Sequence, residues 1–164
     1  MANDAYRSTD FSLTVEERIK AYYQSVTNDS CFQGFDVRPL QQVNLISVSP
    51  ETQTVTWEFT VPPFLCNKDG NLHGGAASTI FDNLSSTAQY TISRPGFWHN
   101  LGVTRTLVVS FFRPMPVGTN VVLICEVVAA GKRLAQVKAT MKTKDGKVCA
   151  SCFHEKVTAG TPSI

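Results

Sequence analysis

One carboxylate stands in a stretch of the chain that is otherwise free of formal charge. Between Leu72 and Ile92 the sequence reads LHGGAASTIFDNLSSTAQYTI, in which Asp82 is set among small, hydroxyl and apolar residues. A carboxylate in such surroundings can serve as a general base or as a nucleophile. It can equally be a structural group that accepts hydrogen bonds inside a packed helix. The residues alone leave both interpretations of Asp82 open.

A glycine pair stands where the helix that carries Asp82 is expected to begin. The stretch follows Gly74 and Gly75 and ends before Pro95, which predicts a helix that is buried because it is apolar or small on every face. The first N–H groups of a helix lack intrahelical acceptors and lie at the positive end of its dipole, so they can hold negative charge. Glycine also lets a ligand approach this backbone closely.

Composition limits the classes of protein that this chain can belong to. Its 164 residues, 43% of them hydrophobic, suit one domain with a full core. The net charge of +2 gives no field that calls for nucleic acid or an anionic membrane, and no apolar run is long enough for stable membrane insertion. Five scattered cysteines argue for a reducing compartment. We therefore expect an intracellular protein, cytoplasmic by default.

The elements around the central helix can be predicted in chain order. A flexible tail at 1–10 precedes a single domain at 11–158, and 159–164 form a second tail. Thr14 and Glu17 have the spacing of a capping box, which predicts a short helix at 14–26, followed by a loop at 28–39. Apolar alternation and turn residues predict strands at 41–48, 53–61, 101–112, 119–130, 134–143 and 148–157.

Several antiparallel strands with one helix that is apolar on all sides predict a sheet that curls around the helix, an α+β fold. Open strand edges favour pairing between subunits. The pair Cys149 and Cys152 could suggest a metal or redox site. Because it falls inside a predicted strand and has no second pair to accompany it, we expect structural thiols and no metal.

The motifs at these spacings resemble the hot-dog fold thioesterases of the PaaI-like, acyl-CoA thioesterase 13 type. The resemblance covers about 55–157 and rests on Asn67-x5-His73-Gly74-Gly75-x6-Asp82-Asn83, on Gly102-Val103-Thr104, on the Pro114-x3-Gly118 turn and on the Gly131-Lys132 hairpin. It implies a sheet wrapped around the long helix, homodimers or homotetramers, an acyl-CoA or acyl-carrier thioester as substrate, and no cofactor besides the coenzyme A of the substrate.

The resemblance also implies roles for single residues. Asp82 matches the catalytic carboxylate, and Asn67 with the N–H of Gly74 matches the groups that polarise the thioester carbonyl. His73 matches a supporting histidine. Thr104 takes the position where, in the family, a serine of the partner subunit helps to orient the water. Threonine departs from the family pattern here but keeps the hydroxyl group. As substrate-binding residues we expect Gly75, Phe81, Lys132 and Arg133, the last two for the phosphates of coenzyme A.

The chemistry of the residues fits these roles, and several of the residues also have a structural interpretation. Thioester hydrolysis needs a base for water and donors for the oxyanion. Asp82 lies about two turns beyond the glycines, roughly 10 Å along the helix, which favours a site built by two chains. Asn67 could instead be a turn residue, His73 a satisfied helix-start residue and Thr104 an ordinary strand residue.

Two other functions compete with hydrolysis. A dehydratase or hydratase of the same fold needs a differently spaced histidine and acid, and a module without catalysis would bind acyl-CoA unchanged. For the acyl group we expect a pocket lined by Ile80, Phe81 and Leu84 of the helix and by the aromatic segment Phe97-Trp98-His99.

Overall fold

The computed structural model describes residue 5 and residues 8–158. It contains the helices α1 (Val15–Thr27), α2 (Val37–Leu40) and α3 (Gly74–Ser86), and the 3-10 helices η1 (Pro63–Leu65) and η2 (Thr87–Thr91). Its strands are β1 (Val43–Ser49), β2 (Thr54–Thr60), β3 (Val103–Phe111), β4 (Asn120–Ala130), β5 (Leu134–Thr143) and β6 (Val148–Val157). Within this part of the chain, none of the helices is long and apolar enough to cross a membrane.

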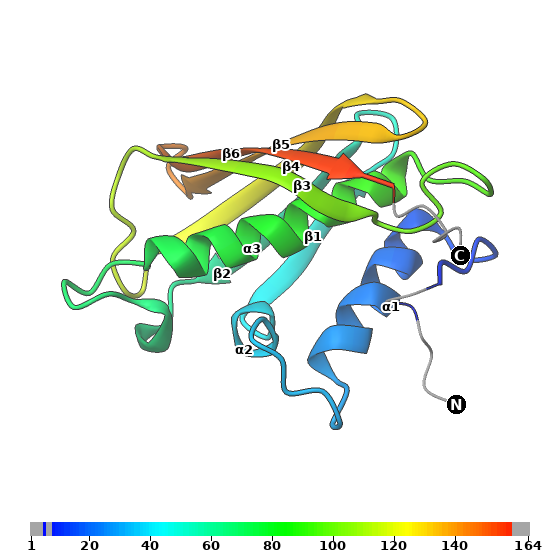
Figure 1. Ribbon diagram of the computed structural model, residues 1–164. Helices are drawn as coiled ribbons and strands as arrows, with labels where there is room; N and C mark the ends of the chain where they lie inside the picture. The colour runs from blue at the N-terminus through cyan, green and yellow to red at the C-terminus, as the bar shows by residue number, and fades with distance from the viewer. Residues whose placement is uncertain (1–4, 6–7, 159–164) are drawn as a thin grey trace.

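The strands form one antiparallel sheet of six strands in the order β1-β2-β4-β5-β6-β3. Figure 1 shows α3 lying along one face of this sheet, with α1 and α2 on the same side. The predicted fold class is confirmed, since the sheet curls around the central helix. Gly146 lies in the tight turn between the neighbouring strands β5 and β6 and adopts a φ of 85°. Gly118, in the connection from the edge strand β3 to β4, adopts a φ of 82°.

The core lies between the sheet and α3. Alternate residues of β2 point inward, and Val55, Trp57 and Phe59 are each at most 2% exposed. From the helix, Ile80, Phe81 and Leu84 are equally buried. The Trp57 indole N–H donates to Thr87 Oγ1 over 3.3 Å and thereby links the middle of the sheet to the end of the helix. This packing fixes where each face of α3 lies relative to the sheet.

The predicted capping box starts α1. Thr14 Oγ1 accepts from the N–H of Glu17, and the Glu17 carboxylate accepts from the N–H of Thr14. Arg18 holds the helix against the segment after η2 by donating to Ser93 Oγ over 2.7 Å. Tyr23 donates to the carbonyl groups that lead into β1. As a result α1 is fixed beside the C-terminal end of the central helix, where Tyr22 meets Tyr90.

A short helix begins where the sequence predicts a loop. The segment at 28–39, predicted as a loop, includes the start of α2, one turn whose Leu40 N–H bonds to the carbonyl of Asp36. The sequence does not predict this turn because Pro39 lies within it, and proline usually indicates the end of a helix. The predicted tail at 159–164 and most of the tail at 1–10 lie outside the described residues. The extent of the single domain, 11–158, stays a prediction.

Candidate active site

Asp82 meets a hydroxyl from the edge strand β3. Thr104 Oγ1 donates to Asp82 Oδ1 over 2.6 Å, so the third turn of α3 is tied to the beginning of β3. The Asp82 side chain is 43% exposed, unlike Phe81 before it, which is fully buried in the core. The second oxygen, Oδ2, has no hydrogen bond to any described residue. Asp82 therefore keeps one carboxylate oxygen free at the surface of a cleft.

A buried histidine that the sequence analysis did not select stands behind this pair. His154 of β6 is 0% exposed, and its Nε2 lies 2.9 Å from Thr104 Oγ1 and 3.4 Å from Asp82 Oδ1. On the other side of the ring, Nδ1 lies 2.7 Å from Ser85 Oγ of α3. Both ring nitrogens thus have hydroxyl partners, one from each element that carries the site.

The hydroxyl groups fix the tautomer of this histidine. Because Thr104 gives its only proton to Asp82, the bond between Thr104 and His154 requires a proton on Nε2. Nδ1 then accepts from Ser85. Burial, and to a lesser extent the nearby Lys156 ammonium, lowers the pKa of His154 to about 4, although the Asp82 carboxylate acts in the opposite direction. The imidazole is accordingly neutral near pH 7.

Lys156, two residues further along β6, is also buried, at 4% exposure. Its Nζ donates to Ser86 Oγ over 2.9 Å, and Ser86 Oγ donates to the backbone carbonyl of Asp82 over 2.7 Å. Burial lowers the pKa of Lys156 to about 8, against the attraction of the Asp82 carboxylate. A cation therefore lies inside the molecule close to the acid.

The free side of Asp82 opens into a cleft of about 420 Å³. It is lined by helix, strand and loop residues: Tyr22, Asp82, Asn83, Ser86, Asn100, Leu101, Gly102, Val103, Thr104 and Lys156. Gly102 has a φ of +59°, and a Cβ there would lie 2.5 Å from the carbonyl oxygen of Val157. Only glycine suits this position. Here the backbone packs against the end of β6, two residues before Thr104.

The predicted carbonyl-binding residues lie at the other end of α3. His73 is its N-cap residue, and its Nδ1 accepts from the N–H of Gly75 over 2.9 Å. Gly74, the first helical residue, has no intrahelical acceptor for its N–H. Phe111 of β3 lies nearby, since a Cβ on Gly74 would be 3.5 Å from its ring. Asn67 is exposed and its Oδ1 accepts from the N–H groups of Asp69 and Asn71, as in a turn.

Within one chain the structure therefore joins Asp82 to Thr104 and keeps both apart from the helix start. Thr104 was expected to act from a partner subunit, but here it reaches Asp82 of its own chain. The structural interpretations of His73 and Asn67 describe their contacts in the single chain. Their catalytic roles, and that of Gly74, stay predictions.

The residues expected around the acyl group are placed differently. Phe81 is 0% exposed in the core between α3 and the sheet. Its role in substrate binding stays a prediction. Trp98 is 2% exposed and donates from Nε1 to the carbonyl of Gly131 over 2.8 Å. This indole thereby anchors the loop after the helix to the hairpin between β4 and β5. Neither aromatic residue lines the cleft at Asp82.

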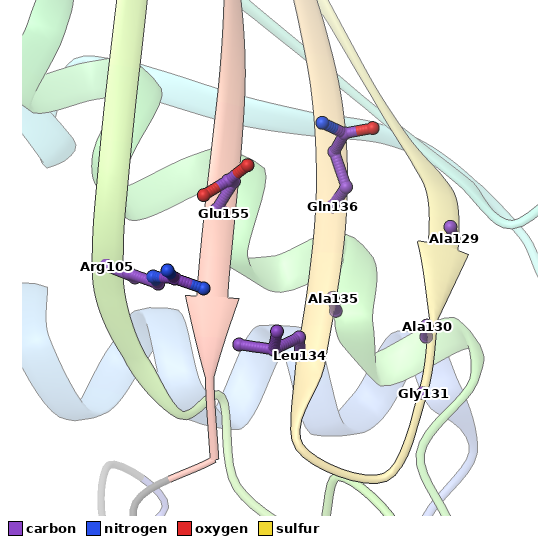
Figure 2. A pocket seen from close by; sticks show the side chains of 8 residues that line it. All are labelled: Arg105, Ala129, Ala130, Gly131, Leu134, Ala135, Gln136 and Glu155. Carbon is purple, nitrogen blue, oxygen red and sulfur yellow. The ribbon is translucent and has the colours of Figure 1, made fainter.

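A second hollow, of about 480 Å³, lies on the sheet face that points away from α3. Figure 2 shows Arg105 and Glu155 on neighbouring strands, with Gln136 and Leu134 on β5. Arg105 directly follows Thr104, so the edge strand β3 separates this hollow from the cleft. The exposed Lys132 and Arg133 follow Gly131, which lines the hollow. The hollow contains the carboxylate of Glu155 but not Asp82, and the cations Arg105, Lys132 and Arg133 lie in it or next to it.

The chemistry of the cleft points to Asp82 more than to Thr104. A hydroxyl 2.9 Å from an imidazole suggests a nucleophile with its base. However, the pKa of about 4 makes His154 a weak base, and its Nδ1 faces a hydroxyl where such a base usually has a carboxylate behind it. Among the described residues, no group of three or more His, Cys, Asp or Glu side chains could hold a metal ion.

An antiparallel sheet wrapped around one helix that carries a partly exposed acid defines a hot-dog fold protein. The model of the thioesterase superfamily matches residues 69–150, a span that includes α3 and the edge strand. The chain belongs to the thioesterase superfamily, and the predicted enzyme class is confirmed.

Curated relatives narrow the resemblance. The chain is 34% identical to mouse acyl-coenzyme A thioesterase 13 over 125 residues, which cover 75% of this chain and 84% of the relative. Its identity to the human protein of that name is 30% over 120 residues, or 73% of this chain and 81% of the relative. The predicted resemblance to the acyl-CoA thioesterase 13 type is thus confirmed.

Solved structures agree on the fold. The zebrafish thioesterase superfamily member 2 superposes with a TM-score of 0.76 at 27% identity, covering 90% of this chain and 99% of that one. The Escherichia coli PaaI protein superposes with a TM-score of 0.61 at 17% identity, over 70% of this chain and 82% of that one, and supports the fold alone.

Proposed function

We propose that this protein hydrolyses acyl-CoA thioesters, with the carboxylate of Asp82 as the catalytic base or nucleophile. The observation that carries the proposal is the Asp82 carboxylate itself, which is held at Oδ1 by Thr104 while Oδ2 remains free beside an open cleft. The name of the curated relatives, acyl-coenzyme A thioesterase 13, supports acyl-CoA as the substrate class. A thioester on an acyl-carrier protein has the same reactive group and is the alternative substrate.

In the proposed reaction, Asp82 takes a proton from water while the water oxygen attacks the thioester carbonyl carbon. The tetrahedral intermediate places negative charge on the carbonyl oxygen, and its collapse breaks the C–S bond. The proton then passes to the leaving thiolate, which gives a free acid and coenzyme A. Alternatively an Asp82 oxygen attacks the carbonyl carbon, and the C–S bond breaks as the thiolate leaves. Water then cleaves the resulting anhydride, which restores the Asp82 carboxylate, releases the free acid and supplies the proton of the thiol. Neither route needs a metal or a cofactor beyond the coenzyme A of the substrate.

We propose that the oxyanion is held by Gly74 and Asn67 of a second subunit, with His73 supporting the helix start. Within one chain, Gly74 and Asp82 lie about two helical turns apart, too far to serve one carbonyl. Strand β3 offers an interface because it is an edge strand with large exposed apolar residues: Val103, Val108 and Phe111 are 52%, 56% and 53% exposed. Such an edge favours pairing with a second copy, in a homodimer or homotetramer.

For the nucleotide end of coenzyme A we propose the cations next to the outer hollow. Lys132 and Arg133 lie on the β4–β5 hairpin, and Arg105 adds a third cation at the rim of β3. Phosphate groups would be held by these side chains. Only β3 separates the hollow from the cleft. A substrate that runs past the end of this strand would place its nucleotide in the hollow and its thioester in the cleft. Gly75, at the exposed helix start, would border the pantetheine arm.

The decisive experiment compares the wild type with Asp82→Asn on a panel of short, long and aromatic acyl-CoAs. Thiol release should fall at least a thousandfold in the variant, because the amide can neither accept a proton from water nor attack the carbonyl. The folded state should be retained, as judged by circular dichroism. Equal activity of the variant would refute the proposal. Tight acyl-CoA binding without hydrolysis by the wild type would identify the non-catalytic alternative, and hydration of an enoyl-CoA the hydratase.

A further inference from the structure

Strand β6 carries two buried titratable side chains to which the proposed mechanism gives no task. His154 and Lys156 are 0% and 4% exposed and lie two residues apart, so both point toward α3. Burying an imidazole and an ammonium group is costly unless each is hydrogen-bonded. Both make their hydrogen bonds to residues that hold Asp82 or its helical turn.

The first path leads from α3 through His154 to the carboxylate. Ser85 donates to Nδ1, Nε2–H donates to Thr104 Oγ1, and Thr104 donates to Asp82 Oδ1, over 2.7, 2.9 and 2.6 Å. Every donor in this path is used once and in one direction. The hydroxyl of Thr104 could rotate toward other acceptors, but the N–H of His154 occupies its lone pair and leaves its proton for Asp82.

The second path leads from Lys156 to the backbone of the same residue. Lys156 Nζ donates to Ser86 Oγ, and Ser86 donates to the carbonyl oxygen of Asp82. In a helix this carbonyl also belongs to the main-chain hydrogen bonds, so the serine bond adds a second constraint on the turn. The ammonium group lines the cleft beside Asp82 and is attracted to its carboxylate.

We infer that His154 and Lys156 are positioning residues for Asp82. His154 fixes the carboxylate through Thr104, and Lys156 fixes the helical turn through Ser86, so that Oδ2 stays directed to the cleft. This inference rests on the proposed function, since it assigns to the pair a part in orienting the proposed base. Neither residue touches the reacting atoms, and neither transfers a proton.

A matched pair of substitutions at His154 tests the first path. The amide nitrogen of Gln reaches the place of the imidazole Nε2 and can donate to Thr104, whereas the shorter Asn reaches only the place of Nδ1. We expect His154→Asn to lower kcat about 10- to 100-fold per folded protein with KM changed less than twofold, because a misdirected base costs rate and not affinity. His154→Gln should recover most of that loss.

The matched substitution for the second path is Lys156→Met, which keeps an unbranched side chain only one atom shorter and removes its donors. We expect kcat to fall about 3- to 30-fold with an unchanged KM, and Ser86→Ala to show a loss of similar size. Lys144→Met, in the exposed turn between β5 and β6, is the control for loss of a lysine and should leave both constants unchanged. The double variant Lys156→Met/Ser86→Ala should lose little more than either single variant, since both act through one path.

A spectroscopic measurement tests the inference separately from catalysis. Nitrogen NMR of the wild-type imidazole should show His154 neutral at pH 7 with its proton on Nε2, and Thr104→Val should shift the Nε2 signal. If the wild type hydrolyses no thioester but this signature is found, the proposed function fails while the network stands. A proton on Nδ1, equal kcat for His154→Asn and His154→Gln, or an activity loss that a smaller amount of folded protein fully explains would overturn the positioning role.

Discussion

Thr104 reaches Asp82 from within the same chain, and the bond between Thr104 Oγ1 and Asp82 Oδ1 measures 2.6 Å across 22 residues of sequence. The acid is therefore oriented before any second subunit arrives. What a second copy would add is the helix start with Gly74, which lies at the far end of α3. Assembly and base orientation are thus separate requirements, and substitutions can address each of them alone.

Replacing Thr104 by Val removes the hydroxyl at nearly constant volume. We expect kcat for acyl-CoA hydrolysis to fall about 10- to 100-fold, equivalent to roughly 1 to 3 kcal/mol for a hydrogen bond to a charged group. Thr104→Ser keeps the hydroxyl and should retain most of the activity. Steady-state kinetics on folded protein measures both. Complete loss in Thr104→Val, together with an acylated Thr104 in the wild type, would instead make the hydroxyl the nucleophile.

Much of the scaffold can be predicted from the sequence because its signals are local. The capping box of Thr14 and Glu17 predicts the start of α1. The alternation of apolar and polar residues in β2 predicts both the strand and its buried face. The Gly74 and Gly75 pair marks the beginning of α3. In each case the residues that carry the signal are the residues that make the structure.

The support of Asp82 could not be predicted because it depends on which face of β6 turns inward. Alternation offers two choices there, Phe153 inside or His154 and Lys156 inside, and hydrophobicity favours the first. The structure adopts the second, with Phe153 48% exposed. The sequence does contain one indication: His154 and Lys156 alternate with the same period as Cys152, so all three share one face of β6. In the structure this face lies opposite the helix that carries Asp82. Trp98, expected to line the acyl pocket, is held elsewhere by a contact that is distant in sequence, since its indole N–H bonds to the carbonyl of Gly131, 33 residues away.

The buried Lys156 should make stability depend on alkaline pH. Its pKa is lowered from an ordinary value of 10.5 to about 8 by burial, so the unfolded chain binds more protons between these values. The contribution of this residue to stability is therefore present above pH 10.5 and is lost as the pH falls through 8. Relative to the wild type, Lys156→Met should gain up to about 3 kcal/mol at pH 7, at 1.36 kcal/mol per pKa unit.

Urea unfolding of both proteins at several pH values checks this expectation. The advantage of Lys156→Met should shrink between pH 8 and 10.5, and the titration of buried cysteines and tyrosines cancels in the comparison. A constant difference across that interval would mean that the ammonium group is not destabilised in the folded protein. Lys144→Met, at an exposed lysine, is the control for the loss of one positive charge.

Substituting Lys132 and Arg133 by Ala tests the proposed contact with phosphates. We expect KM for acyl-CoA to rise about 3- to 10-fold with kcat unchanged, because exposed cations contribute modest binding energy each. The difference should shrink at high salt. Acyl-pantetheine, which lacks the nucleotide, should be hydrolysed equally by both proteins. A rise in KM with acyl-pantetheine as well would show that the hairpin acts on the pantetheine or acyl portion.

Gln89 offers a test of the core beside the site. It is 0% exposed at the end of the central helix, and neither Oε1 nor Nε2 has a hydrogen-bond partner among the described residues. An unsatisfied buried amide costs about 1 to 3 kcal/mol. Gln89→Leu, of similar volume, should therefore raise the free energy of unfolding by about 1 kcal/mol, measured by urea titration. Because the residue lies outside the cleft, kcat should stay within twofold. Destabilisation would instead mean that the amide is satisfied by a group inside the core.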